Sequence, residues 1–186
     1  MTAAPLDATN DSPRAESLRY PHVEPASPEQ FRDVVASLAT AVSIVSTAGR
    51  AGLAGMTCSA VSVLSDDPPM LAVVVHQKSA ANRVIKGNGV LCVNCLNADQ
   101  KDLSLLFAGV GNVAMPDRFA RGGWSVLATG APHCLEALLA LDCEVVDAHD
   151  IGTHTLFAAK VVATGRSVSG EPLVYYRRAF GSVRPV

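Results

Sequence analysis

The stretch Gly55-Met56-Thr57-Cys58-Ser59-Ala60-Val61-Ser62 decides the fold, because it combines the period of a β-strand with unusually small side chains. Successive residues of a strand point to opposite faces, so Thr57 and Ser59 share one face while Cys58 and Ala60 share the other. A flat heterocycle or a phosphate can approach the backbone and hydroxyl groups of such a strand closely. The alternative is that the side chains are small only because a barrel interior or a subunit contact is crowded.

Strand patterns continue on both sides of this stretch, which itself belongs to one long predicted strand over 53–64. The run at 70–75 is continuously apolar, which is typical of a strand covered on both faces. The other predicted strands cover 41–47, 90–95, 135–146, 155–164 and 173–177. Six or seven strands with few, short helices predict a mainly β fold that closes, or nearly closes, into an antiparallel barrel.

Three helices are predicted from their start and stop signals. Ser27 is a candidate N-cap followed by Pro28, and Gln30 can complete a capping box. A second helix begins at Lys78-Ser79 and ends before a Gly-Asn-Gly sequence at 87–89. Asn97 can cap a third helix that runs to Phe107. Loops are expected over 110–133, where Trp124 is an anchor, and over 147–153.

Composition limits the class of protein. The chain has 186 residues, 49% of them hydrophobic and 17% charged, with a net charge of -2, which fits one globular domain and offers no electrostatic surface for nucleic acid. No apolar run reaches the ~18 residues of a membrane span. Five cysteines form no disulfide framework, so we expect free thiols in the cytoplasm. Residues 1–26 are expected to form a mobile tail and 27–186 the domain.

Two motifs of familiar appearance are interpreted as structural. The string Gly109-Val110-Gly111-Asn112-Val113-Ala114 has glycines at dinucleotide-binding spacing, but it follows a helix, and Met115-Pro116 is expected to prevent another helix from starting. A Rossmann domain is therefore excluded. Cys92 and Cys95 form a C-x-x-C motif, but residues three apart on a strand face opposite sides, so both are predicted to be core thiols and no metal site is predicted.

Polar residues at the ends of predicted elements are candidates for binding. Ser79 and Asn82, at a helix N-terminus, could bind a phosphate or be an ordinary cap. His154, where a connection enters a strand, could assist a heterocyclic cofactor or be a surface or core histidine. Arg118 and Arg177 could bind phosphates or be charges at the rim.

Taken together, ordered segments over about 29–180 resemble the short-chain flavin reductase family, and most closely the reductase components of two-component 4-hydroxyphenylacetate and chlorophenol monooxygenases. The segments that carry the resemblance are Phe31-Arg32-Asp33, 39–47, 55–61, 67–69, 88–94, 107–109, Arg118-Phe119 with Trp124, 152–154 and 172–177.

The resemblance implies a split β-barrel of Greek-key type, a homodimer, and FMN or FAD bound near the dimer interface. It implies an NAD(P)H:flavin oxidoreductase that uses NADH or NADPH and supplies reduced flavin to a separate monooxygenase acting on an aromatic compound. Since hydride passes between the cofactors themselves, no obligatory catalytic residue is expected. The alternatives are a flavin- or haem-binding split-barrel carrier without turnover, and a dimeric barrel whose small-residue strand serves packing.

The resemblance also implies roles for particular residues. His154 would lie near the nicotinamide and assist catalysis, and Ser79 with Asn82 would lie near the flavin phosphate. The family often has Gly where this chain has Ala41. The residues carried over as cofactor-binding are Met56, Thr57, Cys58, Ser59, Ala60, Ser62, Ser79, Asn82, Asn94, Ala108, Gly109, Arg118, His154, Tyr175 and Arg177.

Overall fold

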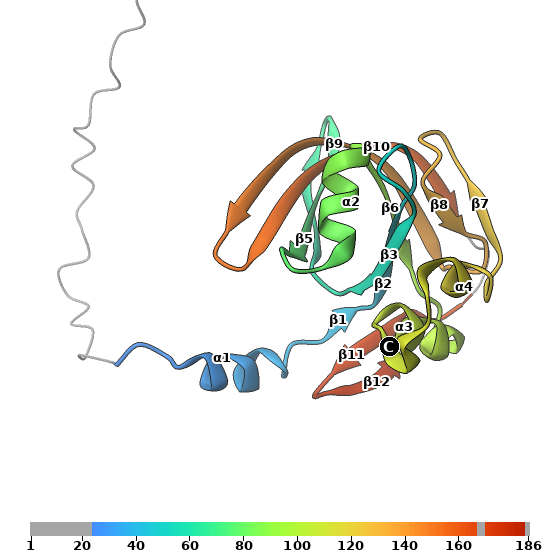
Figure 1. Cartoon of the computed structure of the whole chain (residues 1–186). Coiled ribbons are helices and arrows are strands. Elements are labelled where there is room, and N and C mark those ends of the chain that lie inside the picture. The colour runs from blue at the N-terminus through green and yellow to red at the C-terminus, as the bar shows by residue number, and fades with distance from the viewer. Residues whose placement is uncertain (1–23, 167–169, 185–186) are drawn as a thin grey trace, which may run out of the picture.

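A seven-stranded antiparallel sheet forms the centre of the protein, seen in a computed structural model that describes residues 24–166 and 170–184 (Figure 1). Its strand order is β3-β2-β6-β9-β10-β5-β4. The strands are β2 (Ser43–Thr47), β3 (Ala54–Cys58), β4 (Val61–Asp66), β5 (Pro69–His76), β6 (Val90–Cys95), β9 (Leu139–Ile151) and β10 (His154–Arg166).

The sheet closes because β3 and β4 are its two edge strands and only Ser59 and Ala60 separate them in the chain. Two residues cannot span an open sheet, so the edges must curl towards each other. The single strand predicted over 53–64 is wrong in this detail: its first half pairs with β2 and its second half with β5, and the ladder breaks between them. The predicted split β-barrel is confirmed.

Helix α2 (Ala80–Asn88) lies against the barrel opening (Figure 1). Its buried side chains Ala81 and Ile85 pack into the main core beside Phe157, which is fully buried. The helix runs two residues past its predicted end, because only Gly89, the last residue of the Gly-Asn-Gly sequence, acts as the C-cap, with a left-handed φ of 69°. The burial of these apolar side chains fixes α2, and with it Ser79 at its N-terminus, relative to the sheet.

A second layer lies beside the barrel and forms one side of the candidate site. It contains a three-stranded sheet of β1 (Thr40–Ala41), β11 (Leu173–Tyr176) and β12 (Ala179–Ser182), and the helical segments η1 (Ala98–Gln100) and α3 (Lys101–Phe107). The predicted cap at Asn97 is confirmed, and its side chain forms a capping box with Gln100. Strand β12 was not predicted; it forms after a turn in which Arg177 and Arg178 both have positive φ.

The segment from 110 to 133 contains more structure than the predicted loop. It forms η2 (Val110–Asn112), α4 (Met115–Phe119), β7 (Trp124–Val126) and β8 (Pro132–Cys134). The expectation that Met115-Pro116 prevents a helix is wrong, because proline in the first turn loses no helical hydrogen bond. Trp124 is the predicted anchor, with its ring centroid 4.8 Å from that of Phe119.

The connection predicted over 147–153 is also wrong. Strands β9 and β10 continue as a twisted pair, and only Gly152 and Thr153 separate them. The polar residues at 147–150 therefore belong to a strand whose end is exposed, where side chains need not be apolar.

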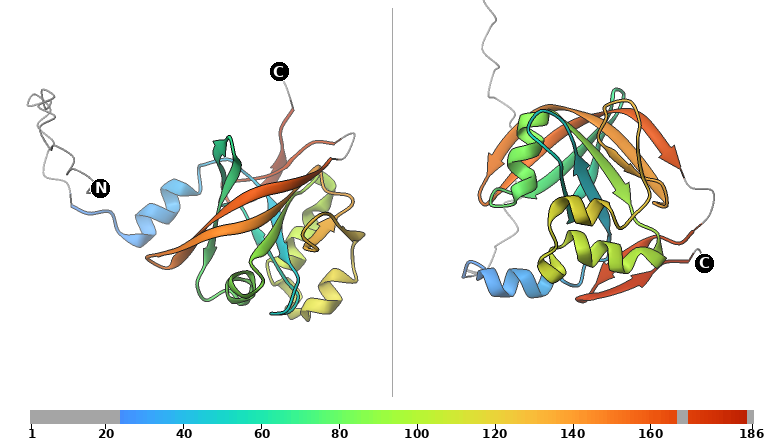
Figure 2. Two further views of the ribbon diagram at one scale, coloured as in Figure 1. Left: turned by 90° about the horizontal axis from the view of Figure 1, so that it is seen from above. Right: turned by 45° about the vertical axis from the view of Figure 1, so that its right-hand side comes forward.

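Helix α1 (Pro28–Val35) extends away from the barrel (Figure 2). Its capping box of Ser27 and Gln30 is confirmed, and none of its residues is buried. An ion pair of 2.6 Å between Asp33 and Arg178 ties it to the β11–β12 turn. Residues 1–23 of the predicted tail lie outside the described residues, so its boundary at 26, and the domain from 27 to 186, stay predictions. Within the described part of the chain, no helix could span a bilayer.

Candidate functional site

A cavity of about 270 Å³ lies where the break between β3 and β4 meets α3 and the β11–β12 hairpin. Four of the predicted cofactor-binding residues come together here from distant parts of the chain: Thr57, Ser59, Ala108 and Tyr175. The cavity is lined by Val42, Thr57, Ser59, Ser104, Leu105, Ala108, Tyr175 and Phe180.

Strand β3 presents its two faces to different surroundings, as its alternation predicted. Thr57 faces α3, where its Oγ1 donates a hydrogen bond of 2.5 Å to the carbonyl oxygen of Ser104. Cys58 and the partly buried Met56 pack on the other side, against the main core. The cavity therefore receives Thr57 and Ser59 from the strand, and a ligand lying across the break could contact both faces at its edge.

Aromatic side chains form the wall opposite the strand break. The ring of Tyr175 packs edge-on against Phe180 with centroids 5.1 Å apart. Strand β11 is held in place by pairing with β1, where Thr40 lies opposite Tyr175. The cavity thus has hydroxyl groups on one side and apolar surface on the other, which suits a planar ring system with one polar edge.

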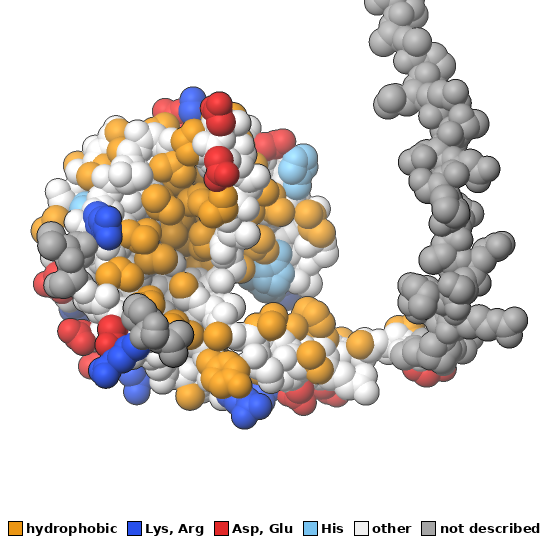
Figure 3. Space-filling model, turned by 180° about the vertical axis from the view of Figure 1, so that it is seen from behind, with side chains coloured by type: hydrophobic (Ala, Val, Ile, Leu, Met, Phe, Trp, Pro, Cys, Tyr) orange, Lys and Arg blue, Asp and Glu red, His pale blue; other side chains and the backbone are white. Residues whose placement is uncertain are grey.

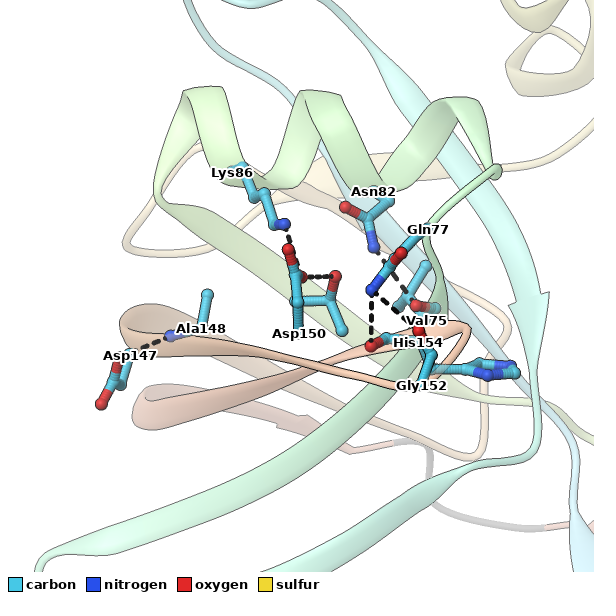
Figure 4. Close-up of polar contacts among 10 residues, drawn as sticks. Val75, Gln77, Asn82, Lys86, Asp147, Ala148, Asp150, Gly152 and His154 are labelled. Carbon is cyan, nitrogen blue, oxygen red and sulfur yellow. Dashed lines mark hydrogen bonds and ion pairs between the residues drawn. The ribbon is translucent and has the colours of Figure 1, made fainter.

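A second group of predicted residues gathers at the N-terminus of α2. The hydroxyl of Ser79 makes no capping bond and lies 3.5 Å from the sulfur of Met56. The side chain of Asn82 is 3% exposed and donates to the carbonyl oxygen of Val75 at 3.2 Å (Figure 4). The Ser79 hydroxyl thus donates only to a thioether, a weak acceptor that a ligand could replace, whereas the amide of Asn82 already holds the helix to β5.

His154 lies at the start of β10, next to this helix N-terminus. Its ring centroid is 4.9 Å from that of His76, and its Nδ1 lies 2.8 Å from Oγ1 of Thr153. The side-chain amide of Gln77 donates to the carbonyl oxygen of His154 at 3.1 Å. Figure 4 shows that the His154 ring points away from the ion pair of Lys86 and Asp150, and the residue is half-buried.

The polar groups of Asn94 and Arg118 are already engaged by the protein. Asn94 is fully buried; its amide donates to Ser46 and its oxygen accepts from the backbone of Cys134. Arg118 donates from Nε to the carbonyl oxygen of Val113 at 2.8 Å and so holds the segment before α4. Their cofactor roles stay predictions.

Gly109 and Arg177 lie where the chain changes direction. Gly109 has φ of 98° and follows α3. Arg177 has φ of 48°, and the Cζ of its guanidinium group lies 5.3 Å from the ring centroid of Tyr176. Ala60 and Ser62 are exposed at and after the strand break. Gly109 follows helix α3, whereas the glycine motif of a Rossmann domain follows a strand, so the exclusion of that domain holds.

The cysteine thiols are poorly suited to nucleophilic chemistry. Burial is the main cause that raises the pKa values of Cys58 and Cys92. Burial also raises the pKa of Cys143, to about 12. A thiol with a raised pKa carries little thiolate near neutral pH. Within the described ranges, all five cysteines are free and no three His, Cys, Asp or Glu side chains could hold a metal ion together.

Four lining residues were not predicted: Val42, Ser104, Leu105 and Phe180. Ser104 offered a signal, because it stands next to Leu103 and three positions before Phe107 on the apolar side of its helix, where a polar residue needs a reason. Phe180 offered none, because it belongs to the strand that was missed.

A split barrel with a ring-sized pocket at a strand break defines a class of proteins that bind a planar heterocycle. The chain belongs to the flavin reductase-like domain family, whose pattern matches residues 35–184. It is an NAD(P)H-dependent flavin reductase, and its substrates are a flavin and a reduced nicotinamide nucleotide. The predicted family and enzyme class are confirmed.

Individual relatives agree with this assignment. The chain is 41% identical over 161 residues to "FMN reductase (NADH) RutF" of Bradyrhizobium diazoefficiens, covering 87% of this chain and 88% of that protein. It is 41% identical to the "4-hydroxyphenylacetate 3-monooxygenase reductase component" of Salmonella typhimurium, covering 83% and 91%. The crystal structure of BorF, the flavin reductase component of a bacterial two-component tryptophan halogenase, superposes with a TM-score of 0.79 at 30% identity and covers 86% and 100%.

Proposed function

We propose that this protein reduces FMN or FAD with NADH or NADPH and releases the reduced flavin to a separate monooxygenase that acts on an aromatic compound. Relatives named as FMN reductase and as the reductase component of a 4-hydroxyphenylacetate monooxygenase support both halves of the proposal. A structural relative that supplies a halogenase uses the same division of labour.

The pocket at the break between β3 and β4 is the observation that carries this proposal. Its volume of about 270 Å³ lies just below the range of ordinary ligand pockets, ~300–1,000 Å³. It can therefore hold one ring system but cannot enclose a whole dinucleotide. Such an open site suits a flavin that must leave after reduction.

The reaction needs no side chain that transfers a proton or forms a covalent bond, because the flavin accepts a hydride from the nicotinamide directly. Thr57 and Ser59 would orient the ring by hydrogen bonds to its polar edge, and Tyr175 would cover it. The hydroxyl of Ser79 and the N-terminus of α2 would bind the phosphate. His154, half-buried beside that helix, would position the nicotinamide.

We also propose that the protein works as a homodimer in the cytoplasm. Helix α1 carries apolar side chains that nothing in the described chain covers, and Figure 3 shows hydrophobic side chains along α1 and over a broad area of one face of the barrel. Free cysteines suit a reducing compartment.

The test is NADH or NADPH oxidation by the purified protein after addition of FMN or FAD, in all four combinations. Rapid oxidation that requires added flavin is expected, with reduced flavin released into solution. A protein that keeps its flavin on dilution and does not oxidise either nucleotide would instead be a carrier. His154→Ala is expected to weaken NADH binding; full turnover with unchanged NADH affinity would remove His154 from the site.

A further inference from the structure

Ser104 combines two properties that rarely occur together. Its side chain is fully buried, and its Oγ has no hydrogen-bond partner among the described residues. At the same time Ser104 lines the cavity between the strand break and the β11–β12 hairpin. A buried hydroxyl without a partner destabilises a protein, so its retention calls for an explanation.

The surroundings leave the hydroxyl available to a ligand. The carbonyl oxygen of Ser104, not its Oγ, accepts the hydrogen bond from Thr57 and the helical bond from the N–H of Ala108. The side chains of Leu105 and Phe180, which also line the cavity, offer no polar partner. The lining hydroxyls of Thr57, Ser59 and Tyr175 make no hydrogen bond with it either. The hydroxyl can donate one hydrogen bond, and the cavity is the space from which an acceptor can come.

We propose that the Oγ of Ser104 donates a hydrogen bond to a carbonyl oxygen or ring nitrogen on the polar edge of the bound flavin. Together with Thr57 and Ser59, it makes the hydroxyl-lined side of the pocket that selects a ring with acceptors on one edge. This assignment rests on the proposed flavin reductase function and adds a residue to its binding site.

The variant Ser104→Ala separates ligand binding from stability. Without flavin it is expected to melt at the same temperature as the native protein or higher, because a hydroxyl without a partner is removed. Its dissociation constant for FMN, measured by quenching of flavin fluorescence, is expected to rise about three- to tenfold, the equivalent of one net hydrogen bond. Ser104→Cys, which keeps the shape but donates only weakly, is expected to bind FMN almost as poorly.

Ser46→Ala is the matched control, because Ser46 is also fully buried but bonds to Pro132 and Asn94. It is expected to lower the melting temperature without flavin and to leave FMN affinity unchanged. Native FMN affinity in Ser104→Ala, or a lower melting temperature without flavin, would overturn the assignment of Ser104. A native protein that binds no flavin would instead overturn the proposed function.

Discussion

Gly55 occupies a position in β3 that has no room for a methyl group. A Cβ there would lie 2.7 Å from Cε1 of Phe107 and 3.0 Å from Cζ of Phe119. Both rings belong to the cluster that also holds Trp124, so neither can move alone. We expect Gly55→Ala to lower the free energy of unfolding by about 1–3 kcal/mol, as overpacked cores do. Urea denaturation measures this change.

Gly181→Ala is the control for this substitution. Gly181 also lies in a strand, β12, and a Cβ there would meet nothing within 4 Å. Its free energy of unfolding should stay within about 0.5 kcal/mol of the native value. Equal destabilisation by both variants would show that loss of glycine from a strand, and not contact with the aromatic cluster, is responsible.

Asn94 is the residue whose predicted role and observed surroundings differ most. Its side chain bridges the carbonyl oxygen of Ile44 and the backbone N–H of Cys134, at 3.1 Å and 2.8 Å. We expect Asn94→Ala to lower the free energy of unfolding by about 1–3 kcal/mol, because it leaves buried partners unpaired. FMN affinity should be nearly unchanged. A large loss of affinity at native stability would instead place Asn94 in the flavin site.

Local patterns in the sequence predicted some site residues and not others. Thr57 and Ser59 could be assigned to one face, because alternation along a strand depends only on neighbouring residues. The hydrogen bond from Thr57 to Ser104 could not be predicted, since it depends on how α3 packs against β3. Phe180 reaches the pocket through the β11–β12 turn, which only the folded structure reveals.

Among elements, α2 is held to the β9–β10 hairpin by an exposed ion pair. Lys86 lies 2.8 Å from Asp150, whose carboxylate also accepts from the hydroxyl of Thr155. Hydrogen bonds from Lys86 and then Thr155 hold the pKa of Asp150 below its ordinary value. A carboxyl group with a lowered pKa stabilises the fold above its unfolded pKa and loses that effect as the pH falls through the folded value.

Asp150→Asn therefore should reduce stability at neutral pH, and the difference from the native protein should shrink as the pH falls into the range where Asp150 protonates. Urea midpoints at several pH values measure this. Glu144→Gln, on the same strand and exposed, is the control and should show a smaller effect. A difference that persists undiminished in acid would mean that the ion pair is not its cause.

The elements themselves were predictable where their signals are local. The capping boxes of Ser27 and of Asn97 fix two helix starts by contacts within three residues. The break at Ser59 was not predictable, since it exists only because two different strands pair with the two halves of one segment. Helix α4 was missed because proline near a helix start was interpreted as a barrier.

At the scale of the molecule, α1 is a helix that packs none of its side chains into the core of the barrel. Its exposed apolar side chains Phe31, Val34 and Val35 continue in Leu38 just beyond its end, and Val34 is 73% exposed. Contacts between Arg178 and Asp33, and between the N–H of Arg177 and the carbonyl oxygen of Ala36, fix where the helix projects. A short isolated helix is marginally stable in water, so we expect the apolar surface of α1, which the described residues leave uncovered, to be buried against a partner.

A two-fold dimer would bury this surface in both copies at once, since each copy has the same arm. We expect Val34→Glu to place a charge in that contact, shift sedimentation velocity towards the monomer, and remove the rise of melting temperature with protein concentration that a dimer shows. Glu29→Lys, on the same helix but already polar, should sediment like the native protein. Native sedimentation of Val34→Glu would exclude α1 from the interface, and a native protein that stays monomeric at every concentration would exclude the homodimer.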